Sequence, residues 1–327
     1  MIRLATVGTS FICESFLSGA GLTKRFLLSA VYSRNAETGK AFGEKFGCDT
    51  VFCDLEEMAK SPSVDAVYIA SPNVFHYDQS KLFLQNKKHV ICEKPITSNL
   101  SQYKELKALA DKNGVIYMEA IIPLHTDHYE KVKTAFKKIG NPVSARFDFS
   151  QRSSRLDSFL KGEQVNIFDM SLHAGTLMDL GVYCVYAACD FFGQPKKIIA
   201  NANFFENGAD KSGSALFTYD DFSVFLSYCK NAQGNLGSEI IGENGVLKIK
   251  FISQYAGVSL VIDGQEELVA QFPSKPELMS GEARKFADYI EHFEEFNSDY
   301  TEKSNLCLLV HKCMDEIKSN AELSYSV

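Results

Sequence analysis

Short apolar runs alternate with segments of helical spacing through the first 120 residues. The runs predict buried strands over residues 2–7, 26–32, 64–70, 89–93 and 115–118. The segments between them predict helices over residues 35–46, 74–84 and 100–110. Because strands that alternate with helices favour a doubly wound parallel sheet, residues 1–120 are expected to form an α/β domain.

The pattern changes after residue 120. Period-2 alternation predicts strands over residues 142–150, 197–205, 214–219 and 222–228, and Glu243-Asn244-Gly245 predicts a hairpin turn. Helices are expected over residues 125–138, 174–192, 282–296 and 301–319. This mixture predicts a second domain over residues 121–327, of the α+β class, with a large and mostly antiparallel open sheet.

Composition narrows the class of protein. A formal net charge of −7 over 327 residues argues against nucleic acid or an anionic membrane as the main partner. The nine cysteines show no CxxC spacing, which favours reduced thiols over disulfides or zinc. The sequence has neither a signal-peptide pattern nor an apolar run of about 18 residues. We therefore expect a soluble, cytoplasmic protein.

The first predicted strand runs into a glycine turn and then a helix. This order is typical of a dinucleotide-binding unit, in which pyrophosphate lies at a helix N-terminus. Only the first glycine of GxGxxG is present, as Gly8, while Ser10 and Cys13 stand in the second and third positions. The candidate cofactor-binding residues of this turn are Gly8, Thr9, Ser10, Phe11 and Ile12.

The strand over residues 89–93 ends in Glu93-Lys94-Pro95. Proline ends the strand, and ligands of open α/β sheets bind at the carboxyl ends of strands. A lysine held there against an apolar sheet can act on a proton. The ordinary alternative is a Glu-Lys pair on a solvated loop. We also expect the Lys94–Pro95 peptide to be cis.

Two other strand ends supply candidate cofactor contacts. The second strand ends in Tyr32-Ser33-Arg34, with no carboxylate before Glu37. Arginine suits a 2′-phosphate, so Ser33 and Arg34 predict NADP, with NAD as the possible alternative. The third strand leads into Ser71, Pro72, Asn73 and His76. His76 is expected either to contact cofactor or substrate, or to cap or pack against its own helix.

These features occur together with Asp179-Leu-Gly181-Val-Tyr183 in the second domain. The chain thereby resembles the Gfo/Idh/MocA oxidoreductase family over essentially its whole length, and most resembles members of the glucose–fructose oxidoreductase and dihydrodiol dehydrogenase type, which have tyrosine in the active site. The resemblance implies a Rossmann domain that binds NAD(P). It further implies a sheet domain that contacts substrate and mediates a homodimer or homotetramer.

The motif match implies that Lys94, Asp179 and Tyr183 are catalytic, with Glu93, Lys94 and Pro95 near the nicotinamide. Positions 179 and 183 share a helix face, which is consistent with a common cleft. Tyr183 is expected to transfer the proton, Lys94 to favour the phenolate and donate to the substrate oxygen, and Asp179 to orient Lys94 or bind a second hydroxyl. Asp179 as a buried helix-stabilising group and Tyr183 as a core aromatic remain open alternatives.

The expected reaction transfers a hydride between nicotinamide and a secondary alcohol or carbonyl of a sugar, polyol or dihydrodiol. The alternative is a non-catalytic regulatory protein that senses the dinucleotide. Glu119, His125 and His128 lack a further ligand at metal-site spacing, so we expect them on helix surfaces and expect no metal.

Overall fold

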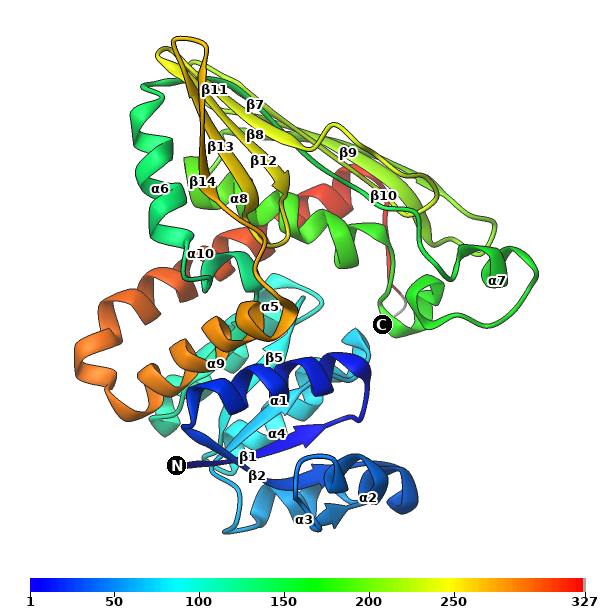
Figure 1. The fold of residues 1–327 in the computed structure, drawn as a ribbon. Coiled ribbons are helices and arrows are strands. Elements are labelled where there is room, and N and C mark those ends of the chain that lie inside the picture. Colours follow the sequence, from blue (N-terminus) through cyan, green and yellow to red (C-terminus); the bar gives the residue numbers. More distant parts are fainter. Residues whose placement is uncertain (326–327) are drawn as a thin grey trace. The chain divides into compact units, whose positions relative to one another are not determined.

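The computed structural model describes residues 1–325, which contacts divide into two units (Figure 1). The first unit contains Met1–His125 and Ser274–Ser304. The second contains Thr126–Pro273 and the described chain from Asn305 onward. The expected boundary at residues 120 and 121 lies close to the first division, but the return of residues 274–304 to the first unit differs from it.

A parallel sheet of six strands forms the centre of the first unit, in the order β3-β2-β1-β4-β5-β6. Its strands are β1 (Ile2–Val7), β2 (Phe26–Tyr32), β3 (Val51–Phe52), β4 (Ala66–Ile69), β5 (His89–Glu93) and β6 (Tyr117–Ala120). The strand order reverses between β1 and β4, where doubly wound folds bind their ligands. The prediction of a Rossmann-type α/β domain is confirmed; the short β3 had not been predicted.

Helices connect these strands, and several begin at the polar residues expected of a helix start. They are α1 (Phe11–Thr23), α2 (Ala36–Glu44), α3 (Leu55–Lys60), α4 (His76–Gln85) and α5 (Leu100–Asn113), with 3-10 turns η1 (Asn73–Phe75) and η2 (Ile122–Leu124). The side chains of Asn35 and Asn99 accept the backbone N–H groups of Thr38 and Gln102.

Helix α9 (Lys275–Glu291) belongs to the first unit because it packs directly on α1. A Cβ atom at Gly19 of α1 would lie 2.6 Å from the backbone nitrogen of Ser280, so only glycine permits this approach. Arg25 also pairs with Asp288 and Glu291 of α9. A helical period in the sequence predicts that one face of α9 is buried, but it does not show that α1 is the element that covers this face.

An eight-stranded sheet dominates the second unit, in the order β14-β13-β12-β11-β7-β10-β9-β8. Its strands are β7 (Pro142–Ser150), β8 (Lys197–Phe204), β9 (Asp210–Thr218), β10 (Ser223–Cys229), β11 (Ser238–Gly242), β12 (Gly245–Phe251), β13 (Ala256–Ile262) and β14 (Gln265–Ala270). Only β7 and β10 pair in parallel. The predicted α+β class and the hairpin between Gly242 and Gly245 are confirmed.

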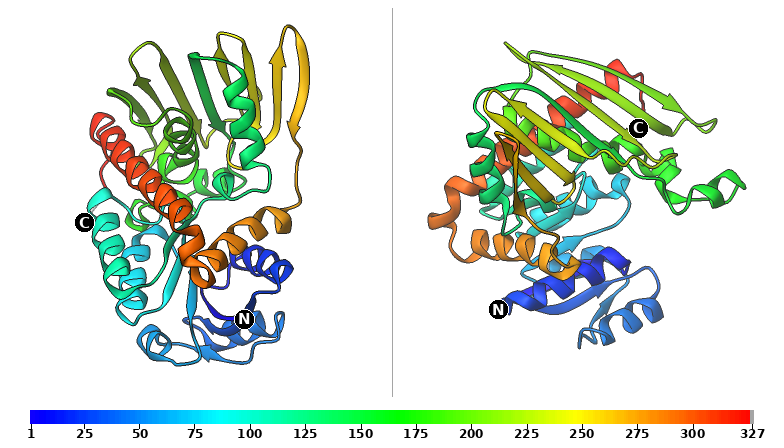
Figure 2. Two further views of the ribbon diagram at one scale, coloured as in Figure 1. Left: turned by 90° about the vertical axis from the view of Figure 1, so that its left-hand side faces the viewer. Right: turned by 45° about the horizontal axis from the view of Figure 1, so that its top comes forward.

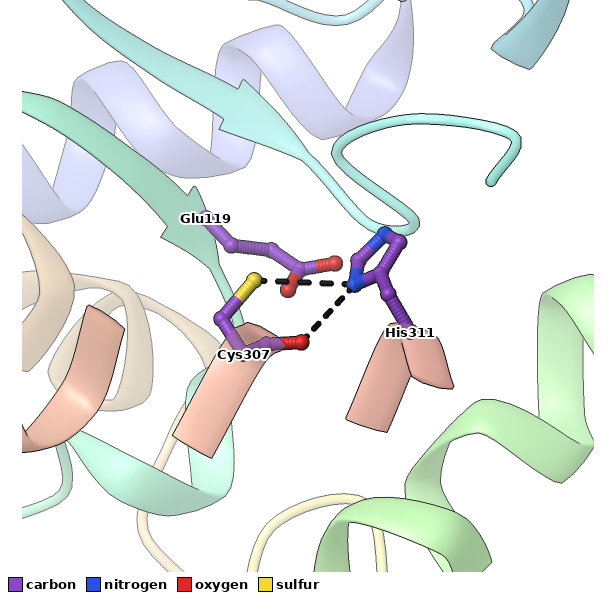
Figure 3. Close-up of side chains that lie close together, drawn as sticks. All are labelled: Glu119, Cys307 and His311. Atoms are coloured by element: carbon purple, nitrogen blue, oxygen red, sulfur yellow. Dashed lines mark hydrogen bonds between the residues drawn. The ribbon is translucent and has the colours of Figure 1, made fainter. Parts of the chain in front are cut away.

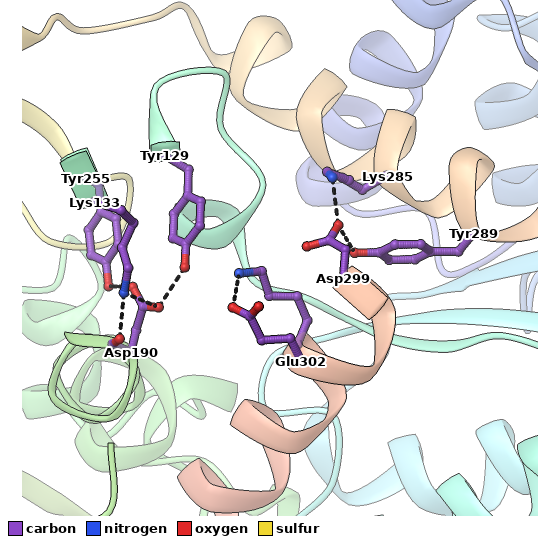
Figure 4. A network of polar contacts seen from close by, with 9 residues as sticks. Tyr129, Lys133, Asp190, Tyr255, Lys285, Tyr289, Asp299 and Glu302 are labelled. Carbon is purple, nitrogen blue, oxygen red and sulfur yellow. Dashed lines mark hydrogen bonds and ion pairs between the residues drawn. The ribbon is translucent and has the colours of Figure 1, made fainter. Parts of the chain in front are cut away.

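The helical elements of the second unit are α6 (Tyr129–Lys138), α7 (Leu156–Leu160), η3 (Asn166–Phe168), η4 (Met170–Leu172), the π-helix η5 (Leu177–Gly181) and α8 (Val182–Phe192). Helix α8 packs on one face of the sheet, against β7 and β10 (Figure 2). Asp190 of α8 accepts hydrogen bonds from Tyr129, Lys133 and Tyr255, which ties α6 and the start of β13 to it (Figure 4).

Helix α10 (Phe293–Asn320) passes from the first unit into the second. Within the first unit, Asp299 accepts Lys285 and Tyr289 of α9, at 2.6 and 2.9 Å (Figure 4). Across residues 1–325, no helix combines the length and the apolar character needed to cross a membrane.

Candidate active site

The glycine turn lies at the carboxyl edge of the first unit's sheet, between β1 and α1. Gly8 has φ of 112°, and a Cβ atom there would lie 3.4 Å from the Ala70 carbonyl oxygen beyond β4. Thr9 and Ser10 complete the turn, and Phe11 and Ile12 begin α1. Buried Cys13 packs beneath the turn in the third glycine position. The turn therefore presents backbone N–H groups at a helix N-terminus, the arrangement suited to a pyrophosphate.

The end of β2 lies beside this turn, because the Gly8 N–H donates to the Tyr32 carbonyl. Ser33 is buried and its hydroxyl accepts the Asn35 N–H, whereas Arg34 is exposed. An exposed guanidinium next to the nucleotide turn suits the 2′-phosphate of NADP.

His76 joins the two loops that follow β4 and β5. The ring is fully buried, with Nδ1 2.9 Å from the Pro95 carbonyl and Nε2 2.8 Å from the Ser71 carbonyl. Burial lowers the pKa of His76. Because both ring nitrogens contact backbone, we assign His76 to positioning the loop of Ser71, Pro72 and Asn73 against Pro95.

The Glu93-Lys94-Pro95 segment follows β5 directly, and the Lys94–Pro95 peptide is cis, as predicted. Glu93 accepts the hydroxyl of fully buried Tyr68 at 2.5 Å and the Lys94 N–H at 3.3 Å. Burial raises the pKa of Glu93, while the Tyr68 hydrogen bond opposes the change. Lys94 thus follows a fixed carboxyl group at the sheet edge.

Glu282 of α9 is a buried acid that sequence reasoning missed. It is fully buried, and neither carboxyl oxygen has a hydrogen-bond partner among the described residues. Burial raises the pKa of Glu282 well above its usual range, and the neighbouring charge of Glu93 adds to this. The 3.6-residue period of α9 predicts that Glu282 lies on the buried face of the helix, and this periodicity could have identified it.

Asp179 and Tyr183 lie in the second unit on η5 and α8. The expected helix over residues 174–192 starts at Leu177 as a π-helix, an irregularity that is frequent at functional sites. Tyr183 is buried and its ring packs edge-on against Phe149. These residues occupy one helical segment, as predicted, although its first turn is not α-helical.

Buried Asp210 fixes the start of this segment. Its carboxylate accepts the N–H groups of Thr176 and Leu177 at 2.9 and 2.7 Å. A Cβ atom at Gly175 would lie 2.0 Å from Asp210 Oδ1, and the φ of Gly175 is 137°. Glycine is therefore required where the chain enters the helix.

Asp179 forms an ion pair with Lys230, whose Nζ lies 2.8 Å from Asp179 Oδ2. Sequence reasoning missed Lys230, yet the alternation of β10 contains the signal. Val224, Leu226 and Tyr228 all point inward, and Lys230 continues the same period. A lysine at a buried period-2 position indicates a specific partner.

The prediction that His125 and His128 lie on helix surfaces was wrong. His125 and His128 are buried before α6, which begins only at Tyr129. His128 Nε2 lies 2.9 Å from the Gln254 carbonyl, and burial lowers the pKa of His125 to about 3. Glu119 is buried on β6 and accepts the Ile96 N–H.

Figure 3 also draws Cys307 and His311, one turn apart on α10. The His311 ring contacts its own helix, with Nδ1 3.0 Å from the Cys307 carbonyl and 3.7 Å from its Sγ atom. The contact between Cys307 and His311 therefore lies within α10.

Comparison with known proteins agrees with this arrangement. Residues 2–121 match the description "Oxidoreductase family, NAD-binding Rossmann fold", and residues 130–248 match the "GFO/IDH/MocA C-terminal domain". The NADP-dependent scyllo-inositol 2-dehydrogenase IolU of Bacillus subtilis is 38% identical over 99% of this chain and 98% of its own.

More distant similarities extend the comparison. A trans-1,2-dihydrobenzene-1,2-diol dehydrogenase of Xenopus tropicalis is 28% identical over 72% of this chain and 71% of its own. The 3-ketoreductase KijD10 of Actinomadura kijaniata, solved with NADP and TDP-benzene, has a TM-score of 0.82 at 22% identity over 98% of both chains, a likeness of fold. The matches to both domains and the full-length similarity show that this chain belongs to the Gfo/Idh/MocA family of oxidoreductases.

Proposed function

We propose that the protein is an NADP-dependent dehydrogenase that interconverts a secondary alcohol and a ketone on a free polyol of the inositol type. The observation that supports this proposal most directly is the 38% identity to an NADP-dependent scyllo-inositol 2-dehydrogenase, which spans 99% of this chain. The dihydrodiol dehydrogenase relatives support the same reaction class, oxidation at a ring carbon that carries a hydroxyl group.

The first unit binds the cofactor at the carboxyl edge of its sheet. The backbone of Gly8 to Ile12 holds the pyrophosphate, and Ser33 and Arg34 hold the 2′-phosphate. The φ of 112° at Gly8 supports this assignment, because residues with a side chain rarely adopt this backbone conformation in such a turn. The bound cofactor supplies the hydride acceptor. Ser71, Pro72, Asn73 and Pro95 border the same edge.

The chain's own residues handle the proton and the charge on the substrate oxygen. Tyr183 removes the hydroxyl proton during oxidation and returns it during reduction. Lys94 stabilises negative charge on that oxygen by donating a hydrogen bond. Asp179 accepts a hydrogen bond from a second hydroxyl of the substrate.

The exposed face of the eight-stranded sheet supports a homodimer. Ile199, Leu216 and Phe225 are aligned across β8, β9 and β10 and are 49%, 37% and 44% exposed. An apolar row of this kind marks an interface. None of the nine cysteines, all within the described residues, forms a disulfide, which supports a cytoplasmic location. Sedimentation equilibrium of the native protein and of Phe225→Glu tests the dimer, which the variant should weaken.

Turnover of a substrate panel tests the function. Purified protein is assayed with NADP and with NAD against scyllo-inositol, myo-inositol, glucose, xylose and a trans-dihydrodiol, by absorbance of the reduced cofactor. We expect turnover of an inositol with NADP preferred. Tight NADP binding by calorimetry, without turnover of any member, would instead favour the non-catalytic nucleotide sensor.

A further inference from the structure

The Asp179–Lys230 ion pair borders a cavity of about 250 Å³ within the second unit. The remaining lining residues are Gln151, Arg152, Ser153, Ser154, Ile167 and Leu180. The side chain of Lys230 is only 2% exposed, whereas that of Asp179 is 40% exposed. The buried Lys230 ammonium and the accessible Asp179 carboxylate therefore lie next to each other in the wall of this cavity.

The Lys230 ammonium is held in place from several sides. It pairs with Asp179, lies 3.5 Å from the Ile167 carbonyl and lies over the Phe168 ring at 5.6 Å. The backbone of Lys230 is fixed as well, by hydrogen bonds with Lys211 and Ser153. Because an ammonium group has three N–H donors, this geometry allows one further acceptor on the cavity side.

The charges around the cavity are balanced. Lys230 is opposed by Asp179, and Arg152 is opposed by Asp157 through two hydrogen bonds of 2.8 and 3.4 Å. The hydroxyl groups of Ser153 and Ser154 add donors and acceptors without charge. A phosphate or carboxylate ligand finds no uncompensated cation here, whereas a neutral polyhydroxylated ligand finds both donors and acceptors.

We propose that Lys230 is a substrate-binding residue that, together with Asp179, recognises two adjacent hydroxyl groups of an uncharged, single-ring polyol. Asp179 accepts from one hydroxyl and Lys230 donates to its neighbour, so the ion pair matches a vicinal diol. The cavity is smaller than the roughly 300–1,000 Å³ of sites for drug-sized ligands, which favours one ring. This inference rests on the proposed function and deepens it, because it names the residue that selects the diol.

The test pairs a residue change with a substrate change. Lys230→Met removes the donor and nearly preserves the length of the side chain, and Lys230→Gln is the second variant, because its amide still donates to Asp179. Both are assayed with the best inositol and with its monodeoxy analogues. Lys248→Met is the matched control, because Lys248 forms an exposed pair with Glu266 at 2.9 Å on the same sheet.

We expect the native protein to discriminate against one deoxy analogue by on the order of 10- to 100-fold in kcat/KM. Lys230→Met should raise KM for inositol by a similar factor and lose that discrimination, with the NADP dissociation constant unchanged. Lys248→Met should behave as native. A merely structural role for Lys230 would lower the turnover of every analogue equally.

The two proposals fail in distinguishable ways. If the native protein turns over no polyol, the proposed function is wrong. If it does, but Lys230→Met and Lys230→Gln both keep the native KM and the native discrimination, Lys230 does not bind substrate and this inference is overturned. A Lys230→Met protein that does not fold leaves Lys230→Gln as the deciding variant, and its circular dichroism melting curve shows that it is native.

Discussion

The Tyr68 hydroxyl donates a hydrogen bond to Glu93 Oε1 at 2.5 Å, immediately before Lys94 in the chain. Tyr68 is fully buried and its ring stacks on Phe16 of α1, with centroids 4.0 Å apart. One residue thereby links the glycine-turn helix, the sheet and the carboxyl group preceding Lys94. Contacts of the buried Tyr68 side chain therefore fix Glu93 at the carboxyl edge of the sheet.

Tyr68→Phe should destabilise the protein by about 1–3 kcal/mol, because it leaves the half-buried carboxyl group of Glu93 with one donor fewer. The stacked ring is retained, so the change isolates the hydrogen bond. Urea unfolding followed by circular dichroism gives the difference. Tyr77→Phe is the control, because its hydroxyl contacts Glu105 at the exposed surface and should matter little.

Glu282→Gln should make the protein more stable than native at alkaline pH. Burial raises the pKa of Glu282 well above its usual range, so the folded state retains a proton that the unfolded state loses near pH 4.5. Native stability therefore falls as pH rises above that value, by at most about 1.4 kcal/mol per pH unit for one proton. The amide carries no such proton.

Denaturant unfolding of both proteins between pH 4 and pH 9 measures this difference. The gain from Glu282→Gln should grow with pH and should be constant below the unfolded-state pKa. Glu295→Gln, an exposed change on α10, should leave the pH profile unaltered. A Glu282→Gln difference that does not depend on pH would contradict the assignment.

Local patterns in the sequence predicted most of the fold. Each predicted strand of the first sheet is present, and the boundaries of β2 and β7 agree with the structure. The period of two residues and the turn at Glu243 to Gly245 are local properties, so they could be read directly. The motif residues Gly8 and Lys94 directly follow β1 and β5, and Asp179 and Tyr183 lie in the helical segment that begins at Leu177.

Long-range packing accounts for what was missed. The attachment of α9 to α1 depends on Gly19 fitting against Ser280, a contact that no short segment reveals. Local periodicity could have marked Lys230 and Glu282 as buried, but their neighbours Asp179 and Glu93 are distant in sequence. The π-helix at Leu177 begins where Asp210, far along the chain, accepts its first N–H groups.

Arg34→Ala should weaken NADP binding by about 10- to 100-fold and change NAD binding little, because the guanidinium is proposed to bind the 2′-phosphate, which NAD lacks. Titration of each cofactor by calorimetry measures both constants. Lys60→Ala serves as the control, since Lys60 is an exposed cation paired with Glu56 on α3. Equal loss of affinity for both cofactors would contradict the role of Arg34.

Tyr183→Phe should reduce turnover on the order of 10²–10⁴-fold while NADP affinity stays nearly unchanged, because only the hydroxyl that we propose to transfer the proton is lost. Lys94→Ala should be at least as damaging, since it removes the donor to the substrate oxygen. Tyr186→Phe, in the buried core of the same helix, controls for packing. Native turnover in Tyr183→Phe beside an inactive Lys94→Ala would instead route the proton through lysine.

Hydride transfer itself is the central claim, and isotope transfer measures it directly. The protein is incubated with NADP and scyllo-inositol that carries deuterium on its ring carbons, and the reduced cofactor is analysed by NMR and mass spectrometry. The account predicts deuterium at C4 of the nicotinamide, on one face of the ring, and no transfer in Lys94→Ala. Saturating NADP binding, with no deuterium in the cofactor at any inositol concentration, would contradict it.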